Sequence, residues 1–341
     1  MILVTGGTGL VGSHLLYQLL QKEQKVRAIY KRAHKLKTVK HVFSYYTDDS
    51  DSLYDKIEWV EADITDIPKL EDVFQNITHV YHCAAFVSFE PDKYRTLRNI
   101  NIKGTANIVN LSVSNNVKKL VYVSSIATLG NTPNPDIPIS ETTAWNPEED
   151  HNVYAITKYG AELEVWRGTQ EGVPAIIVNP GVIIGPGYWR GGSSGSLFSR
   201  VYKNNAFYTE GSTGYIDVFD VVKPMIALME SEIRNERFIL VSENLKFRTF
   251  SDKISEVLGV EKSKKHAKPW LLRVLWRLDW LNHKVFGKRR KLTKQLAKTL
   301  HEEQRYDNSK IKDALSYNFK SISDSINIVG KFFLEDKKIK N

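Results

Sequence analysis

The stretch Ile2-Leu3-Val4-Thr5-Gly6-Gly7-Thr8-Gly9-Leu10-Val11-Gly12 decides the fold of this chain. Residues 2–4 predict a short buried strand, and the apolar residues within 13–20 predict the helix that follows. Gly6 allows the sharp turn out of the strand, Gly9 lets the backbone approach a pyrophosphate, and Gly12 lets the helix pack close to the sheet. Free N–H groups at the start of that helix then face the phosphates of a dinucleotide. A purely structural Gly-rich turn is the alternative, but the strand before and the helix after favour the binding site.

The composition is that of a globular chain. Its 341 residues are 42% hydrophobic and 26% charged, which suits one large domain or one domain with a smaller lobe. A single cysteine, Cys83, excludes an internal disulfide and favours a reducing, cytoplasmic setting. Met1 leads directly into the first strand, so we expect no signal peptide. The sequence contains no run of about eighteen apolar residues, so we expect no transmembrane helix.

The end of the second predicted strand, residues 25–30, indicates which dinucleotide binds. In NAD-binding units an acidic residue usually ends this strand and accepts the ribose hydroxyls. Here Lys31 and Arg32 follow the strand, and the next acid is Asp48. A carboxylate would repel a 2′-phosphate, whereas Lys31 and Arg32 would pair with it. We therefore favour NADP(H) over NAD(H). The alternative is two ordinary solvated charges at a strand end.

The turn after the third predicted strand, residues 57–61, is also assigned to the cofactor. Asp63 and Ile64 follow this strand, and a carboxylate there can accept a hydrogen bond from an adenine amino group. Asp66 serves equally well as the N-cap of the next helix.

Small residues follow the fourth predicted strand, within residues 79–85. Ala84 and Ala85 would let the cofactor lie against the backbone. His82 is expected to pack in the core, and the sequence shows no ligand spacing for a metal. The helix that begins near residue 99 carries Asn101, which we expect to point toward the site.

Serine, tyrosine and lysine side chains further along the chain can perform acid/base chemistry. The fifth predicted strand, residues 120–125, ends in Ser124 and Ser125, and ligands of open α/β sheets bind at that end. Tyr154 and Lys158 are spaced i and i+4, so they share one helix face. An ammonium group lowers the pKa of a nearby phenol, which can then exchange a proton with a carbinol oxygen that a serine holds. An exposed helix pair is the alternative.

These residues resemble the extended branch of the short-chain dehydrogenase/reductase superfamily, the NAD-dependent epimerase/dehydratase family. The matching motifs are T-G-G-T-G-L-V-G at 5–12, D-I-T-D at 63–66, H-C-A-A at 82–85, N-I-K-G-T at 101–105, V-S-S-I-A-T-L-G at 123–130, Y-A-I-T-K at 154–158 and N-P-G-V-I-I-G-P-G at 179–187. The resemblance implies an α/β fold: a Rossmann-type, doubly wound parallel sheet with a smaller, mainly helical C-terminal substrate lobe.

The resemblance also implies site residues. Ser125, Tyr154 and Lys158 would be catalytic, with Asn101 in support. Ser124 is adjacent, and which serine faces the substrate stays open, although the spacing to Gly130 favours Ser125. The residues assigned to the cofactor by motif are Gly6, Thr8, Gly9, Leu10, Val11, Gly12, Ala84, Ala85, Ser124, Tyr154, Lys158, Pro180, Gly181, Val182 and Ile183. Residues 26–29 with their basic end, and residues 207–222, resemble the dihydroflavonol-reductase and aldehyde-reductase-like subgroup, whose members are often NADPH-dependent.

The domain boundaries follow the same resemblance. Residues 1–180 form the predicted NAD(P)-binding domain, to which residues 212–245 return, and 181–211 with 246–334 form the substrate-binding lobe. Residues 335–341 are a basic tail. The Gly- and Ser-rich stretch 181–195, with Tyr188, Trp189 and Arg190, is the expected substrate-side loop, while Asp220 serves as an N-cap or a ligand contact.

Residues 269–300 combine helical apolar spacing with tryptophans and basic residues. The formal net charge of the chain is +9, and much of the excess lies in residues 262–265 and 288–291. This local bias favours an anionic ligand or surface and predicts no nucleic-acid partner. Two interpretations remain open: a lid over the substrate pocket, or peripheral contact of residues 269–291 with an anionic membrane.

The sequence therefore predicts an NAD(P)-dependent oxidoreductase that reduces a ketone or aldehyde. Tyr154 would protonate the carbonyl oxygen, Lys158 would tune Tyr154 and hold the nicotinamide ribose, and Ser125 would orient the carbonyl. The alternatives are an NDP-sugar epimerase or dehydratase with tightly held NAD, and a non-catalytic NADP-binding scaffold or sensor. Expected partners are a small carbonyl or alcohol substrate and a second copy of the chain, through the helices around residues 105 and 160.

Overall fold

A seven-stranded sheet runs through the centre of the computed structural model, which describes residues 1–132, 134, 136–189, 195–203, 206–287, 290 and 292–338. Its strand order is β10-β6-β5-β4-β1-β2-β3, and every neighbouring pair is parallel. The strands are β1 (Ile2–Thr5), β2 (Val26–Tyr30), β3 (Glu58–Glu61), β4 (His79–His82), β5 (Lys119–Val123), β6 (Ala175–Pro180) and β10 (Glu236–Leu240). The chain winds from β1 to β3 in one direction and from β4 onward in the other, so it reverses between β1 and β4.

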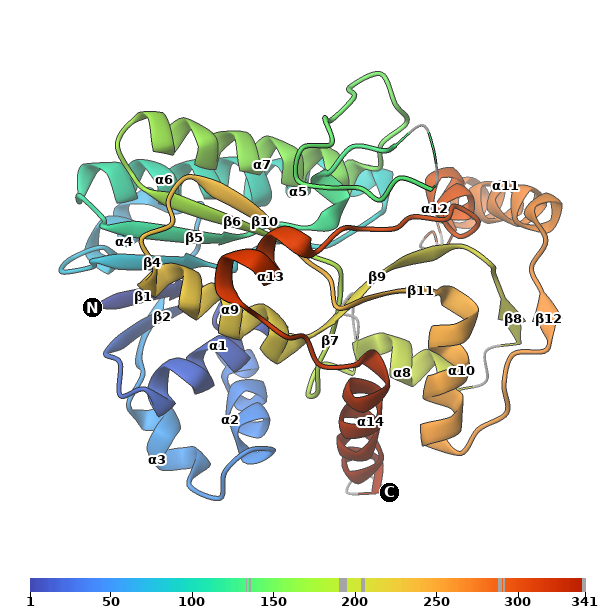
Figure 1. Ribbon diagram of the computed structural model, residues 1–341, viewed down its shortest axis with the longest axis horizontal. Helices are drawn as coiled ribbons and strands as arrows, with labels where there is room; N and C mark the ends of the chain where they lie inside the picture. Colours follow the sequence, from blue (N-terminus) through green and yellow to red (C-terminus); the bar gives the residue numbers. More distant parts are fainter. Residues whose placement is uncertain are drawn as a thin grey trace.

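Helices cover both faces of this sheet (Figure 1). One core lies under α1 (Leu10–Gln21), α2 (Leu36–Ser44), α3 (Ser50–Asp55), α9 (Val218–Glu230) and α13 (Ser309–Leu315). The other lies under α4 (Ile67–Val73), α6 (Gly104–Ser114) and α7 (Val153–Gln170). Strand β5 shows why residues 120–123 are apolar: Val121 packs in the first core, and Leu120 and Tyr122 pack in the second.

A second layer of structure stands beyond the carboxyl ends of the strands (Figure 1). It contains a three-stranded sheet of β7 (Val182–Ile184), β9 (Ser212–Asp217) and β11 (Glu243–Lys246), and a short pair of β8 (Phe207–Tyr208) and β12 (Lys265–His266). Its helices are α8 (Gly195–Tyr202), α10 (Phe247–Leu258), α11 (Pro269–Phe286), α12 (Lys294–Thr299) and α14 (Ile322–Lys338). Phe198, Phe250 and Phe333 fill its core.

The predicted fold class is confirmed by this central parallel sheet and its two helical layers. The domain boundaries stay a prediction, although residues 335–338, assigned above to a tail, are the last residues of α14. Arg190, Lys288, Arg289 and Lys291 lie outside the described residues. Within the described ranges, no helix combines the length and apolar character needed to cross a bilayer.

The prediction of Asp220 as an N-cap was wrong, and its alternative role as a ligand contact stays a prediction. Asp217 is the N-cap of α9 and accepts a hydrogen bond from the Phe219 N–H at 2.8 Å. The Asp220 carboxylate instead accepts from the Tyr317 hydroxyl at 2.7 Å and the Lys320 N–H at 2.8 Å. It therefore ties α9 to the chain that leads into α14.

Candidate active site

One edge of the central sheet collects the predicted site residues, because all its strands are parallel and end on the same side. Gly6 follows β1, Ala84 follows β4, Ser124 follows β5, and Gly181 follows β6. The turns after β2 and β3 lie at the same carboxyl-terminal side, beside the last two strands of the sheet. The remaining residues on that side are Thr8, Leu10, Val11, Lys31, Arg32, Asp63, Ile64, Ala85, Pro180, Val182 and Ile183.

The Gly-rich turn has the backbone shape that its sequence predicts. Gly6 has a φ of +69°, and a Cβ on Gly12 would lie 2.2 Å from the Gly6 carbonyl oxygen. Gly9 is the N-cap of α1 and offers no side chain to cap the helix, so the first N–H groups of α1, beginning at Leu10, stay available. This cradle fits a pyrophosphate, since a Cβ at Gly12 would distort it and the helix dipole favours an anion there.

A basic edge borders the cradle on the side of β2. Lys31 and Arg32 are both exposed. Lys31 forms an ion pair with Asp63, whose carboxylate also accepts hydrogen bonds from the N–H and hydroxyl of Thr65 at 3.0 and 2.9 Å. Burial raises the pKa of Asp63, but these bonds outweigh it, so the net shift is downward. Asp66 is the N-cap of α4, one of the two roles that the sequence allowed it.

Ser125 and Tyr154 lie side by side at the carboxyl end of β5. The Ser125 hydroxyl accepts a hydrogen bond from the Ala127 N–H at 3.2 Å. Burial raises the pKa of Tyr154 to about 12, and the nearby Ser125 hydroxyl, which can donate to the phenolate, acts in the opposite direction. The Ser124 hydroxyl is buried and has no hydrogen-bond partner within the residues that the structure describes. The geometry therefore places Ser125, rather than Ser124, beside the phenol.

Lys158 sits one turn beyond Tyr154 on α7, with 1% of its surface exposed. Its ammonium donates to the Tyr122 hydroxyl at 2.5 Å and to the Val123 carbonyl at 2.8 Å. Burial lowers the pKa of Lys158 to about 7, although the nearby Glu162 carboxylate raises it. Because an ammonium has three donors, one remains for a bound ligand.

The sequence analysis missed two residues that hold Lys158 in place. Tyr122 looks like a core residue of β5, yet its hydroxyl is a direct partner of Lys158. Glu162 is buried one further turn along α7 and accepts hydrogen bonds from Thr128 and Asn179, each at 2.6 Å. Its spacing of i+4 from Lys158 was the available signal. No pattern in the sequence marks Tyr122.

Asn101 acts on backbone rather than pointing into an open site. It lies in a π-helical turn, Arg98–Lys103, and its side chain bonds the N–H and carbonyl of Phe86 at 2.8 and 3.0 Å. Its amide also donates to the Thr157 hydroxyl at 3.2 Å. Asn101 thereby fixes the segment after β4, in which Phe89 packs edge-on against Tyr154 with ring centroids 5.5 Å apart.

The predicted substrate-side loop contacts the cofactor cradle. The Tyr188 hydroxyl donates to the Thr8 carbonyl at 3.1 Å and lies 3.2 Å from the Ser13 hydroxyl. Trp189 is buried, and its indole N–H donates to Asp336 of α14 at 2.5 Å. The loop therefore joins the Gly-rich turn to the last helix.

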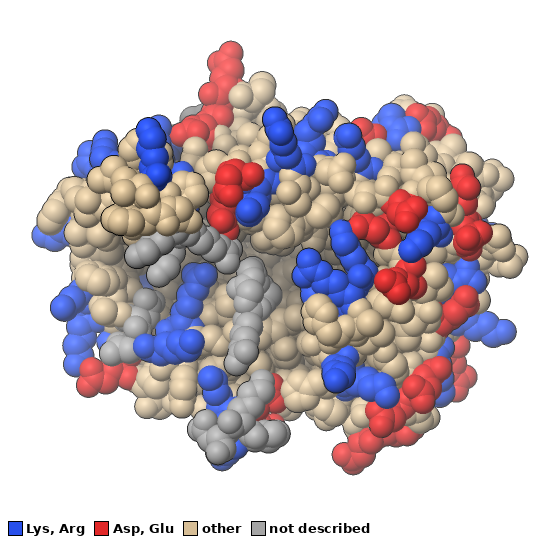
Figure 2. All heavy atoms as spheres, turned by 180° about the vertical axis from the view of Figure 1, so that it is seen from behind, with Lys and Arg blue, Asp and Glu red and all other residues tan. Residues whose placement is uncertain are grey.

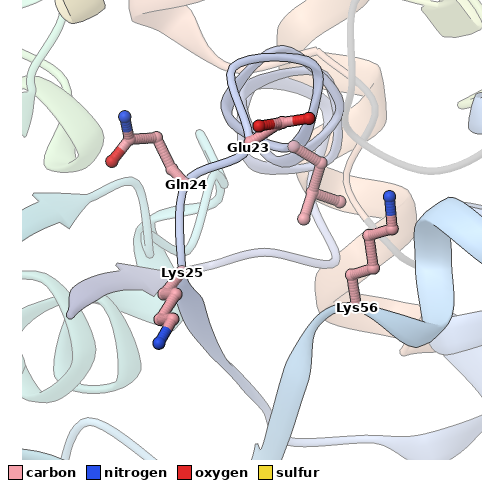
Figure 3. A pocket seen from close by; sticks show the side chains of 5 residues that line it. Glu23, Gln24, Lys25 and Lys56 are labelled. Atoms are coloured by element: carbon pink, nitrogen blue, oxygen red, sulfur yellow. The ribbon is translucent and has the colours of Figure 1, made fainter.

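One hollow on the described surface lies away from this site. The one in Figure 3 is lined by Leu20, Glu23, Gln24, Lys25 and Lys56, which lie at the amino-terminal side of β2 and so away from the site. The face in Figure 2 is hollowed near its centre, and Lys and Arg side chains stand beside that hollow.

Comparison with known proteins identifies the family. The model of the NAD dependent epimerase/dehydratase family matches residues 2–240. The chain belongs to this family. Its members include enzymes of the extended short-chain dehydrogenase/reductase type, so the resemblance drawn from the motifs is confirmed, as is binding of an NAD(P)-type cofactor.

Relatives of the chain carry reductase and epimerase names. Sterol demethylase protein B of Methylococcus capsulatus is 26% identical over 289 residues, covering 84% of each chain. A Synechocystis protein named for dihydroflavonol 4-reductase is 26% identical over 332 residues, covering 95% of this chain and 91% of its own length. The structure of UDP-glucose 4-epimerase from Thermotoga maritima superposes with a TM-score of 0.77 at 20% identity, covering 98% and 99% of the chains. At that identity the likeness concerns the fold alone.

Proposed function

We propose that this family member is an NADPH-dependent reductase that converts a ketone or aldehyde to an alcohol. The observation that carries the proposal is the contact between Ser125 and Tyr154 one helical turn from the buried amine of Lys158. The Tyr154 phenol and the Ser125 hydroxyl lie close enough at the carboxyl ends of the strands to bind one carbonyl oxygen together.

The roles of the residues follow from their positions. Reduced nicotinamide, when bound, supplies a hydride to the carbonyl carbon. Tyr154 donates its phenolic proton to the carbonyl oxygen, and Ser125 holds that oxygen by a hydrogen bond. The Lys158 ammonium stabilises the phenolate left on Tyr154 and uses its remaining donor on the cofactor ribose. The phenolate then takes a proton from solvent, which balances the reaction.

The basic edge supports NADP(H) as the cofactor. Lys31 and Arg32 are exposed at the end of β2, where a 2′-phosphate is read in dinucleotide-binding folds. The carboxylate of Asp63, which pairs with Lys31, is also held by Thr65. A phosphate arriving there gains a charge-assisted contact with Arg32 and competes with Asp63 for Lys31.

An apolar substrate suits the entrance beside Tyr154. Phe89 is 45% exposed and packs on the Tyr154 ring, and Val87 nearby is 42% exposed. The relatives named for dihydroflavonol and sterol chemistry act, by those names, on bulky carbon skeletons. We therefore infer a carbonyl compound with a large apolar body.

The test compares cofactors and then substrates. Fluorescence titration is expected to show tighter binding of NADPH than of NADH. Replacing Lys31 and Arg32 together by Gln is expected to weaken NADPH binding at least about tenfold and to leave NADH binding unchanged, because only the 2′-phosphate contacts are lost. Lys56→Gln, just before the amino-terminal end of β3, is the control. Equal or tighter NADH binding by the unaltered protein contradicts the cofactor assignment.

Tyr154→Phe then tests the reaction on a panel of apolar ketones and aldehydes. We expect turnover to fall about 10²–10⁴-fold with NADPH affinity retained, since the phenol acts only in proton transfer. Tyr202→Phe is the control. NAD that co-purifies tightly, with no dependence of turnover on added NADPH, would establish the epimerase or dehydratase alternative instead. A biological role untouched by Tyr154→Phe would establish the scaffold alternative.

A further inference from the structure

Helix α11 turns an apolar stripe toward solvent. Five residues spaced along one side of its 18-residue length make up this stripe. They are Trp270, Val274, Leu278, Leu281 and Val285, with exposed fractions of 59%, 46%, 56%, 50% and 61%. Their spacing of four, four, three and four residues places them on one face over about 23 Å. Five exposed apolar side chains in one row form a contiguous patch, which marks an interaction surface.

The opposite face of α11 already has its partners. Leu272 is buried and Trp276 is half-buried, and both pack in a small core with Ala267, Leu292 and Ala297. The helix is therefore anchored to α12 by one side. The residues of the exposed stripe take no part in this small core.

Basic residues border the stripe along one side. Arg273, Arg277 and Lys284 are exposed and lie on the flank next to it. Asp279 is the single acidic residue in the helix sequence, and its carboxylate turns inward to accept from the Leu292 N–H at 3.2 Å. In Figure 2 the end of the molecule that carries α11 lies to the left, where Lys and Arg side chains border uncharged surface. The exposed side of the helix is thus both apolar and positive.

Tryptophans of α11 lie next to these cations. The Arg277 guanidinium lies 4.7 Å from the Trp276 ring centroid, and the Lys284 ammonium lies 5.1 Å from that of Trp280. Tryptophan and basic residues together are typical of helices that sit at a bilayer surface, where indole rings occupy the headgroup level.

We propose that α11 binds an anionic lipid surface and lies in the plane of the bilayer interface. The stripe would enter the boundary between headgroups and acyl chains, and Arg273, Arg277 and Lys284 would contact lipid phosphates. Charge complementarity selects this occupant: a second copy docking through the same face would bring like charges together, whereas an anionic surface neutralises them. The proposal does not depend on the reductase assignment.

The contacts of α12 connect this part of the molecule to the segment that leads into α7. Lys294 forms an ion pair with Asp150 at 3.6 Å, and the Gln295 amide donates to the same carboxylate at 3.2 Å. Asp150 lies three residues before the start of α7, the helix that carries Tyr154 and Lys158. A membrane held by α11 would therefore lie next to the segment that leads into the catalytic helix.

Vesicle co-sedimentation of the full chain tests the proposal. We expect the protein to pellet with vesicles of phosphatidylcholine and phosphatidylglycerol at low salt, to bind pure phosphatidylcholine far more weakly, and to be released by high salt. Replacing Arg273, Arg277 and Lys284 together by Gln is expected to weaken binding about a hundredfold, from a loss of roughly fivefold per charge. Lys223, Lys312 and Lys331 replaced together by Gln remove the same charge elsewhere and should leave binding intact.

The apolar stripe is tested separately. Leu278→Ser with Leu281→Ser should reduce vesicle binding, whereas Leu163→Ser on α7, also an exposed leucine, should not. Trp270→Phe should diminish the blue shift of tryptophan emission on vesicle binding. Circular dichroism and NADPH binding verify that each variant is folded. The proposal is overturned if the unaltered protein stays in the supernatant with anionic vesicles at low salt. It is also overturned if the α11 variants bind like the control variants, or if the stripe substitutions instead dissociate a lipid-free dimer.

Discussion

The amine of Lys158 is buried, and its burial makes the free energy of unfolding depend on pH. Burial lowers its pKa to about 7 in the folded protein, whereas the unfolded chain has a lysine pKa of about 10.4. Between these values the unfolded state binds a proton that the folded state does not, so stability rises with pH. Below pH 7 both states are protonated and the buried charge has its full destabilising effect.

A Lys158→Met variant isolates this effect. The difference in unfolding free energy, unaltered protein minus variant, should grow by about 2–5 kcal/mol from pH 7 to pH 10. Urea unfolding at several pH values measures it, and Lys331→Met, an exposed residue of α14, should give a flat difference. A flat difference for Lys158→Met would mean that its amine is charged throughout this range.

Single residues also show how far a sequence can predict this site. The placement of Tyr154 and Lys158 on one helix is predictable because it is local, four residues apart within α7. Tyr122 is not, because its hydroxyl meets Lys158 across 36 residues of chain and its place in a buried strand accounts for it equally well. Asn101 was predicted as a site residue, yet its bonds to Phe86 depend on a loop whose course no local pattern specifies.

At the scale of an element, the turn between β1 and α1 contains two glycines, Gly9 and Gly12, that differ in the space around them. A Cβ on Gly9 would come no closer than 3.3 Å to the Gly6 carbonyl oxygen, and the backbone there has a φ of −100°, which alanine adopts freely. A Cβ on Gly12 would lie 2.2 Å from the same oxygen. The two positions should therefore respond differently to alanine.

Gly9→Ala should keep the fold and lose cofactor affinity by about tenfold or more, because its methyl group occupies the path of the pyrophosphate. Gly12→Ala should lower the unfolding free energy by about 1–3 kcal/mol as well, since the turn has to shift. Thermal unfolding and NADPH titration of both variants separate the two effects. An equal loss of stability in Gly9→Ala would show that both glycines serve the turn alone.

Elements as a whole were more predictable than their contacts. Strands β1 to β5 lie close to where the sequence predicted them, and β5 shows the reason, because a strand buried on both faces requires an apolar run. The cap of α9 is Asp217, whereas the sequence offered Asp220 as an N-cap or a ligand contact, because both acids stand at a helix start and only the backbone decides between them.

Across the whole molecule, Asp336 near the C-terminus fastens α14 to α2. Its side chain is 6% exposed and accepts from the Tyr45 hydroxyl at 2.6 Å, the Trp189 indole at 2.5 Å and the His41 ring at 2.9 Å. Burial raises the pKa of Asp336, but these bonds together outweigh it and lower the net value. The carboxylate therefore stabilises the fold at pH values above about 3.9, and this contribution is lost as pH falls through the lowered pKa.

Asp336→Asn should destabilise the protein by about 1–3 kcal/mol at pH 7, because the amide cannot accept all three bonds. The difference from the unaltered protein should shrink as the pH is lowered toward 3. Urea unfolding at pH 7, 5 and 3.5 measures it, with Asp313→Asn on α13 as the control. If the gap stays constant over that range, the charge of Asp336 contributes nothing.

Strand β10 is the last strand of the central sheet to be synthesised, and it covers the edge of β6. Strand β6 is buried along its whole length, and its outer partner β10 is completed at residue 240, where the family match also ends. A nascent chain that has not reached residue 236 presents β6 as an open edge, which is a template for aggregation. Residue 240 is accordingly the earliest point at which a shortened chain contains all seven strands of its central sheet.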